Sequence, residues 1–299
     1  MKDTQNCCFC GCIGCNRFMS NAHEVRITGT SLPDHAFRAH TVKSLCGETF
    51  QDIAHGKCIG VIIQDFLTGQ ECRKITENFM NSPEVKDRGD GVAGKSIGAD
   101  LYKAMPSEYL EKTQQQRRAV SELFQDTVNV PLKLRETIQR IMPQGSVVRP
   151  ACAFGIEFNH VRAVRWTDNG THALKFHDDQ AQLMDPGQAA LETSRVQWPV
   201  AFNVYPSVSE TGGGLEVYII APDDASRAAL GVSCTGYPYP LELLEGRFAK
   251  LTIMPKAGDL VILSGRFVHG VQGIGGQLPR ILLNHFGGHI DPTTFVTWS

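Results

Sequence analysis

The sequence lacks a long hydrophobic run and lacks an excess of either charge. Its longest apolar stretches, such as residues 58–63 and 260–263, fall far short of the about 20 residues that a membrane helix needs. Lysine and arginine number 29 against 31 aspartates and glutamates, which gives a net charge of −2. Nucleic acids and anionic membranes attract strongly basic faces, so this balance argues against both. We expect a small molecule as the partner, and the oligomeric state stays open.

The first residues also lack the continuous apolar stretch and cleavage site of a secretory signal, which predicts a cytoplasmic protein. Ten cysteines are present, but half of them lie within the first fifteen residues. Four of these five form two Cys-x-x-Cys pairs separated by a single residue, so a zinc or iron–sulfur site would have little chain to enclose. We favour a reducible tail over a metal or redox site there. The five cysteines are Cys7, Cys8, Cys10, Cys12 and Cys15.

A hydrophobic share of 42% with 20% charged residues is typical of a folded chain. Residues 1–55 show little periodicity, which predicts a loosely ordered, Cys-rich N-terminal extension. We expect one domain over residues 56–299. Its first part, 56–145, carries helical patterns, including a capping box at Thr68-x-x-Glu71. The second part, 146–299, contains many short β-rich runs broken by glycine, proline and aspartate. The order predicts an α+β fold, with an antiparallel sandwich or barrel supported by helices.

A candidate metal site lies at the end of one strand-like run, Leu174-Lys-Phe-His-Asp-Asp179. Side chains of an extended segment alternate between faces, so His177 and Asp179 share a face and Asp178 points away. A third ligand is expected from His269, which follows a Gly258-Asp259 turn and a buried apolar strand. Two histidines and one carboxylate with open positions form the facial triad of non-haem Fe(II) oxygenases. The alternative is a hydrogen-bonded His–Asp pair without a metal.

Arg280 lies eleven residues after His269, at the start of the run Arg280-Ile-Leu-Leu-Asn-His-Phe286. A guanidinium one strand beyond the metal can hold the far end of a dicarboxylate in a bidentate pair. If Arg280 points inward, alternation places Asn284 on the same inner face, as a substrate or cosubstrate contact. Asn203 and Tyr205 alternate in the same way in Phe202-Asn-Val-Tyr-Pro206 and are expected to reach the cosubstrate.

Together, His177-x-Asp179, His269 and Arg280 resemble the motif of the Fe(II)/2-oxoglutarate-dependent oxygenases. The glycine-rich stretch Thr211-Gly-Gly-Gly-Leu215 is also similar to a segment of that family. The layout of residues 57–299, with a helical part before the strands, looks like the stand-alone halogenases and hydroxylases that modify small molecules. This resemblance implies a double-stranded β-helix, or jelly-roll, core. It also implies Fe(II) as metal and 2-oxoglutarate and O2 as cosubstrates.

One feature departs from the halogenases within that group. They replace the carboxylate of the motif with glycine or alanine, which opens a position for halide, whereas this chain keeps Asp179. The resemblance therefore implies a dioxygenase that hydroxylates an unactivated C–H bond of a small metabolite or natural product and releases succinate and CO2. Desaturation, cyclisation and halogenation remain alternatives with the same cofactors. Two further alternatives are a non-catalytic jelly-roll binding protein and a cupin-like metalloenzyme that uses no cosubstrate.

Overall fold

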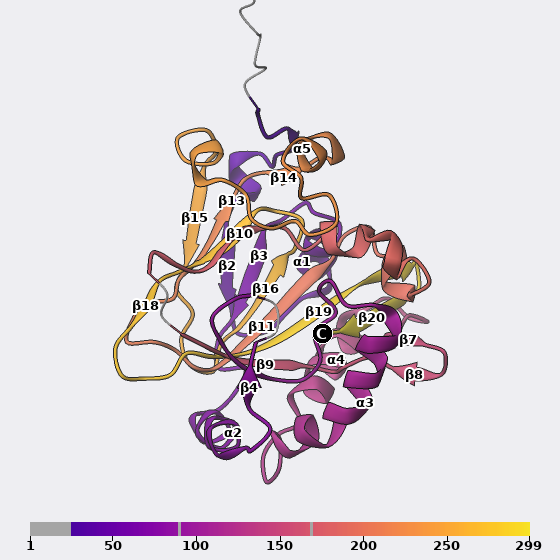
Figure 1. Cartoon of the computed structure of the whole chain (residues 1–299), viewed down its shortest axis with the longest axis vertical. Helices are drawn as coiled ribbons and strands as arrows, with labels where there is room; N and C mark the ends of the chain where they lie inside the picture. The colour runs from indigo at the N-terminus through magenta and orange to yellow at the C-terminus, as the bar shows by residue number, and fades with distance from the viewer. Residues whose placement is uncertain (1–24, 89–90, 168–169) are drawn as a thin grey trace, which may run out of the picture.

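The computed structural model describes residues 25–88, 91–167 and 170–299, and it consists of two facing β-sheets with helices against the larger one (Figure 1). The view shows α2, α3 and α4 in its lower part and β13 and β15 in its upper part. The helices are α1 (Gly47–Ala54), α2 (Gly69–Asn81), α3 (Pro106–Glu122), α4 (Val130–Ile141) and α5 (Asp224–Ala229), and the 3-10 turns are η1 (Asp34–Ala36), η2 (Ala181–Met184), η3 (Pro186–Gln188), η4 (Glu192–Arg195) and η5 (Leu241–Leu243).

The larger sheet has the strand order β2-β3-β16-β11-β19-β9-β5-β4, and β20 joins β19 to β6 beside this path. The smaller sheet has the order β10-β17-β13-β15. Larger-sheet bounds are β2 (Ala39–Val42), β3 (Gly60–Ile63), β4 (Lys86–Asp87), β5 (Gly94–Ile97), β6 (Val147–Pro150), β9 (Arg162–Trp166), β11 (Val200–Ser207), β16 (Leu260–Ser264), β19 (Ile281–Asp291) and β20 (Thr294–Trp298). Smaller-sheet bounds are β10 (His172–His177), β13 (Leu215–Tyr218), β15 (Lys250–Ile253) and β17 (His269–Gln272). Short paired strands are β1 (Gly29–Thr30) with β14 (Ala221–Pro222), β7 (Cys152–Ala153) with β8 (Ile156–Glu157), and β12 (Thr211–Gly212) with β18 (Ile274–Gly275).

The chain passes back and forth between the two sheets. It runs from β9 to β10, β11 and β13, and again from β15 to β16, β17 and β19, changing sheet at each of these steps. Neighbouring core strands are antiparallel throughout. This is the path of a double-stranded β-helix, so the α+β jelly-roll prediction is confirmed.

Alternation along the strands gives the larger sheet two different faces. On β11, Phe202 and Val204 pack outward with α1, α2 and α4 in one hydrophobic core. Asn203 and Tyr205 point to the other face, toward the smaller sheet. The capping box predicted for α2 is present, because Thr68 accepts from the Glu71 N–H and Glu71 accepts from the Thr68 N–H. The helices thus support the sheet from outside and leave its inner face open to a cavity.

The predicted boundary at residue 55 differs from the structure. Within the predicted extension, β2 pairs in parallel with β3, and α1 buries Phe50 and Ile53 completely. Phe50 lies against Phe202, with ring centroids 6.3 Å apart. These two apolar side chains are helically spaced, and their burial joins residues 39–55 to the domain core. Residues 1–24, with the predicted Cys-rich tail, lie outside the described residues.

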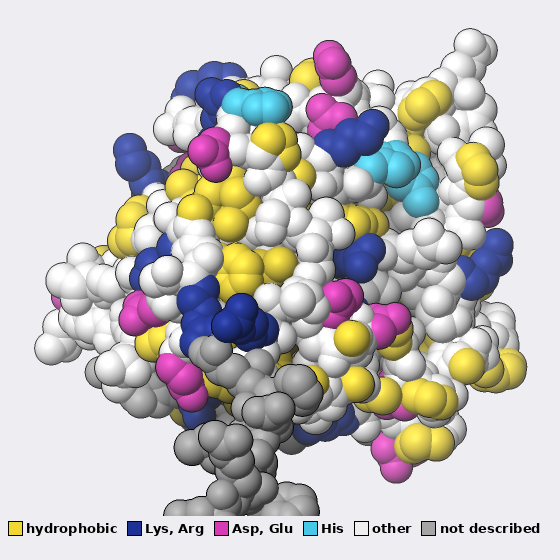
Figure 2. Space-filling model, turned by 90° about the horizontal axis from the view of Figure 1, so that it is seen from above, with side chains coloured by type: hydrophobic (Ala, Val, Ile, Leu, Met, Phe, Trp, Pro, Cys, Tyr) yellow, Lys and Arg dark blue, Asp and Glu magenta, His cyan; other side chains and the backbone are white. Residues whose placement is uncertain are grey.

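In the part of the chain that the structure describes, no helix is both long and apolar enough to cross a bilayer. Figure 2 shows one face of the molecule, on which basic and acidic side chains are interspersed. This mixture agrees with the near-zero net charge.

His285 makes the stability of the fold sensitive to acid. Its Nδ1 lies 2.8 Å from the carbonyl oxygen of His160, and burial lowers its pKa to about 3. The unfolded chain, with a pKa near 6.5, binds this proton first, so unfolding becomes easier as the pH falls from about 6.5 to 3. We expect this group alone to remove about 2 kcal/mol from the free energy of unfolding between pH 7 and pH 5.

Urea unfolding at the two pH values measures this effect. His285→Gln should reduce the difference between pH 7 and pH 5, because the amide cannot take up the proton. His40→Gln, at an exposed position of β2, is the matched control and should leave the difference as it is. Equal acid sensitivity of wild type and His285→Gln would contradict the prediction.

Candidate metal centre and its cavity

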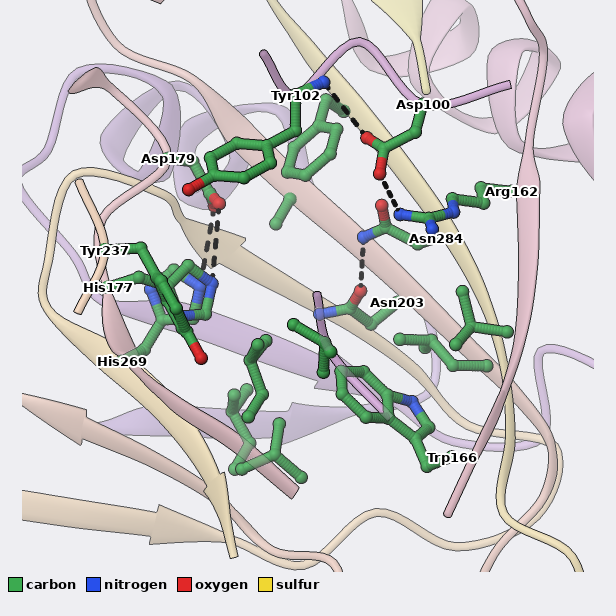
Figure 3. A pocket seen from close by; sticks show the side chains of 18 of the residues that line it. Asp100, Tyr102, Arg162, Trp166, His177, Asp179, Asn203, Tyr237, His269 and Asn284 are labelled. Carbon is green, nitrogen blue, oxygen red and sulfur yellow. Dashed lines mark hydrogen bonds and ion pairs between the residues drawn. The ribbon is translucent and has the colours of Figure 1, made fainter. Parts of the chain in front are cut away.

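Two neighbouring strands bring the predicted metal ligands together. His177 ends β10 and lies directly opposite His269, the first residue of β17, in an antiparallel register. Asp179 follows two residues after His177. Its carboxylate oxygens lie 3.8 Å from His177 Nε2 and 3.5 Å from His269 Nε2. One potential ligand atom from each residue lies within 4.8 Å of the other two, as Figure 3 shows from close by.

The hydrogen bonds of both histidines orient the same ring nitrogen, Nε2, toward the space between the three side chains. His177 Nδ1 lies 2.9 Å from the carbonyl oxygen of Lys175, and His269 Nδ1 lies 2.8 Å from that of Phe267. A carbonyl only accepts, so each Nδ1 carries the proton and each Nε2 keeps a lone pair toward Asp179. Burial also lowers the pKa of His177 well below its usual value. Neutral imidazoles oriented by carbonyls are what a divalent metal requires.

Asp179 completes a donor set that fits a metal. Its Oδ2 is buried and has no hydrogen-bond partner among the described residues. Burial raises the pKa of this carboxyl to about 6, and the neighbouring Asp178 adds to the rise, while His269 opposes it. A divalent cation would satisfy Oδ2 and both Nε2 atoms at once. Two neutral nitrogens and one carboxylate fit Fe(II), while their role as ligands stays a prediction.

Gly265 fixes the position of Asp179. Its carbonyl oxygen accepts the Asp179 N–H at 2.7 Å, and a Cβ at this position would lie 2.7 Å from Asp179 Oδ2. Such a contact is too short, so the carboxylate would have to move. The close approach of Asp179 therefore explains why a glycine lies between β16 and β17.

We expect Gly265→Ala to weaken Fe(II) or Co(II) binding by about 10- to 100-fold, the usual cost of disturbing the surroundings of a ligand. Titration with Co(II), followed by its visible absorption, measures this. Gly69→Ala is the matched control, because a Cβ there meets only Arg73 Nη1, at 3.6 Å. Unchanged Co(II) affinity in folded Gly265→Ala would show that the carboxylate does not need this space.

Asp178 points away from the ligands, as predicted, and it is completely buried. It pairs with Arg227 of α5, at 3.1 and 3.2 Å, and accepts a 2.6 Å hydrogen bond from the Tyr239 hydroxyl. Thr235 and Tyr237, on the segment between these partners, line the cavity. The wall segment that carries Thr235 and Tyr237 is therefore linked to the metal motif through Asp178. The sequence does not reveal this link, because the partners lie 49 and 61 residues away.

Arg280 lies in the same cavity and is only 2% exposed. Its guanidinium lies 5.3 Å from the ring of Tyr205 and 5.5 Å from that of Trp166. Its Nη1 is buried without a hydrogen-bond partner among the described residues, and burial lowers its pKa. A Cβ on Gly213 would lie 3.0 Å from Arg280 Cδ and Nε, which explains a glycine in the Thr211–Leu215 stretch. A carboxylate would satisfy this arginine.

Every residue predicted for the site lines this one cavity. Asn203 and Asn284 pair across β11 and β19, where Asn284 Nδ2 donates to Asn203 Oδ1 at 3.0 Å. Arg162, which is absent from the predicted set, is 7% exposed and pairs with Asp100 in the cavity wall. The alternation of Arg162, Val164 and Trp166 along β9 is the signal that would have found it. The predicted residues in the cavity are His177, Asp179, His269, Arg280, Asn203, Tyr205 and Asn284.

Comparison with known proteins identifies the family. The sequence profile of the carrier-protein-independent halogenase WelO5 matches residues 39–291. The chain belongs to this family. A curated relative of this member is the L-isoleucine 3(1)-dioxygenase of Pantoea ananatis (strain AJ13355), 27% identical over 253 residues that cover 82% of this chain and 84% of the relative.

Among solved structures, the family member resembles a novel N-substituted L-amino acid dioxygenase from Burkholderia ambifaria AMMD. The TM-score is 0.52 with 11% identity, over 85% of this chain and 91% of the other, which supports the shared jelly-roll fold. Family, relative and fold agree with the resemblance seen in the sequence. The protein is an Fe(II)- and 2-oxoglutarate-dependent oxygenase that acts on a small molecule.

Proposed function

We propose that the protein hydroxylates an unactivated C–H bond of a free amino acid or a similar small molecule. His177, Asp179 and His269 would hold Fe(II), and Arg280 would hold the far carboxylate of 2-oxoglutarate. The observation that carries this proposal is that the buried Asp179 carboxylate faces two Nε2 atoms, while its Oδ2 has no hydrogen-bond partner among the described residues. A free amino acid is proposed because the curated relative is an L-isoleucine dioxygenase.

The protein's own contribution is placement. When bound, Fe(II) and 2-oxoglutarate supply an oxidation in which O2 gives one oxygen atom to the substrate and one to succinate, with release of CO2. The carbonyls of Lys175 and Phe267 hold the two imidazoles in the required tautomer. Tyr205 and Trp166 shield the Arg280 guanidinium, which strengthens its pairing with a carboxylate in this buried setting.

Asp179 favours hydroxylation over halogenation, although the family takes its name from a halogenase. The Asp179 carboxylate would occupy the position on the metal that a halide needs. Halogenation is the second candidate, and membership of the family is the observation that favours it. A cytoplasmic location is also proposed, since the described thiols, including buried Cys58 and Cys72, form no disulfide.

The test is substrate-triggered succinate release. Protein, Fe(II), 2-oxoglutarate and O2 are combined with a panel of free L-amino acids, with and without chloride, and products are weighed by mass spectrometry. We expect a product heavier by one oxygen atom that carries label from isotopic O2. Replacement of hydrogen by chlorine in the wild type would overturn the preference for hydroxylation.

Two other outcomes separate the remaining alternatives. Binding of 2-oxoglutarate with Zn(II) but no succinate from any substrate would favour a non-catalytic binding protein. Turnover that is independent of 2-oxoglutarate would favour a cupin-like metalloenzyme.

A further inference from the structure

Asp100 and Arg162 form an ion pair in the cavity wall. Neither residue has a role in the proposed binding of the metal or of 2-oxoglutarate. The Arg162 Nη1 donates to Asp100 Oδ2, and the Tyr102 N–H donates to Asp100 Oδ1 at 3.1 Å. Their side chains are 9% and 20% exposed, with Arg162 the more buried. Figure 3 shows the pair on the opposite side of the cavity from His177, Asp179 and His269, with Asn284 beside it.

The strand register separates this pair from Arg280. Arg162 lies opposite Asn284, and Asn284 lies opposite Asn203, so three polar side chains form a row across β9, β19 and β11. Arg280 lies four residues before Asn284, which corresponds to about 13 Å along an extended strand. The backbone positions of the two arginines are therefore well separated along the sheet. The cavity is lined by three arginines, Arg88, Arg162 and Arg280. Arg88 and Arg280 both lie over the Trp166 ring, and 2-oxoglutarate would use Arg280.

We propose that Asp100 and Arg162 bind the head group of a zwitterionic α-amino acid, with the ammonium on Asp100 and the carboxylate on Arg162. This inference rests on the proposed function and names the part of the site that selects its substrate. The pair is neutral as a whole, so a head group with both charges matches it, while a simple amine or acid leaves one partner unmatched. The same cavity is lined by aliphatic residues, against which the substrate side chain would pack: Val164, Leu174, Leu215, Val271 and Leu282.

Fold stability gives little reason to keep such a pair in the wall of the cavity. Replacing a buried ion pair with well-packed apolar residues is often neutral or stabilising. Asp100 and Arg162 come from segments 62 residues apart, so the pair is not a local helix or turn contact. Ligand recognition supplies the reason. Each charged group can replace part of its contact with the other residue by a contact with the opposite charge on a ligand.

The first experiment compares ligands on the wild-type protein. Each L-amino acid that triggers succinate release is tested beside its N-acetyl and carboxamide forms, which each lack one charge. We expect either form to lower kcat/KM by about 30-fold or more, the loss that follows when a buried charge is left unpaired. The KM for 2-oxoglutarate should stay the same.

The second experiment removes one charge from the protein. Arg162→Gln and Asp100→Asn should each raise the KM for the amino acid by about 30-fold or more, with unchanged 2-oxoglutarate and Co(II) affinity. Asp100→Asn should also lose the preference for the amino acid over its N-acetyl form. Arg165→Gln is the matched control, since Arg165 lies on the same strand outside the cavity and contacts Met80.

The outcomes keep the two proposals apart. If no amino acid or other small molecule triggers succinate release, the proposed function fails. If amino acids do so but their N-acetyl and carboxamide forms serve equally well, only the head-group assignment fails. A rise in the KM for 2-oxoglutarate in Arg162→Gln would place this arginine in the cosubstrate site and overturn the assignment. Co(II) and 2-oxoglutarate binding report that each variant is folded.

Discussion

Asp179→Ala should lower kcat/KM for succinate-coupled hydroxylation by more than about 100-fold, since even residues that only support a ligand cost 10- to 100-fold. The variant removes the single negative charge of the donor set. It leaves His177 and His269 in place, because their orientation comes from the carbonyls of Lys175 and Phe267. Two neutral nitrogens alone are a poor site for Fe(II), so Co(II) affinity should fall together with turnover.

Asp179→Asn is the matched variant for this prediction, because it keeps the shape of the side chain and removes its charge. We expect it to lose metal affinity nearly as strongly as Asp179→Ala. Thermal unfolding without metal should show both variants to be at least as stable as the wild type, because burial of this carboxyl is itself unfavourable. Wild-type activity in Asp179→Ala would exclude the proposed ligand set.

Much of the site follows from local patterns in the sequence. The two-residue spacing of His177 and Asp179 and the alternation of Asn203 with Tyr205 each depend on one strand only, and a period of two fixes the face. The glycine-rich stretch is also a local signal, and Gly213 shows its cause, close approach to Arg280. These features are predictable because each is decided within a few residues.

Features that depend on distant partners could not be predicted in this way. Arg162 becomes part of the cavity because β9 pairs with β19, more than a hundred residues later in the chain. Asp178 becomes a structural link because α5 brings Arg227 to it. Taken alone, each residue is an ordinary charged side chain, for which exposure is the usual expectation. Strand pairing, rather than residue type, determines their roles.

The predicted N-terminal boundary at residue 55 differs from the structure for a related reason. The segment around α1 has few apolar residues, and its helical pattern is short. Its Phe50 and Ile53 are buried because β11 and β20 present aromatic and aliphatic side chains to them, including Phe202 and Phe295. Tertiary packing therefore stabilises this segment, and the local sequence pattern does not predict that stability.

Arg280→Gln should raise the KM for 2-oxoglutarate by about 30-fold or more, because the far carboxylate would lose its charged partner in a buried site. Arg280→Lys should give an intermediate value, since an ammonium keeps the charge but not the bidentate fork. Co(II) affinity should remain unchanged, because Arg280 does not contact the three ligands. Steady-state succinate assays across 2-oxoglutarate concentrations measure the effect.

Gly213→Ala tests the same contact without changing any charge. A Cβ at this position would press on Arg280 Cδ and Nε, and the positive φ of +71° disfavours alanine as well. We expect a higher KM for 2-oxoglutarate, although the guanidinium remains. Arg165→Gln, which removes a guanidinium outside the cavity, should leave that KM as it is. If the KM is unchanged in Arg280→Gln, 2-oxoglutarate must bind elsewhere, and the burial of an arginine between Tyr205 and Trp166 would then need a different ligand to explain it.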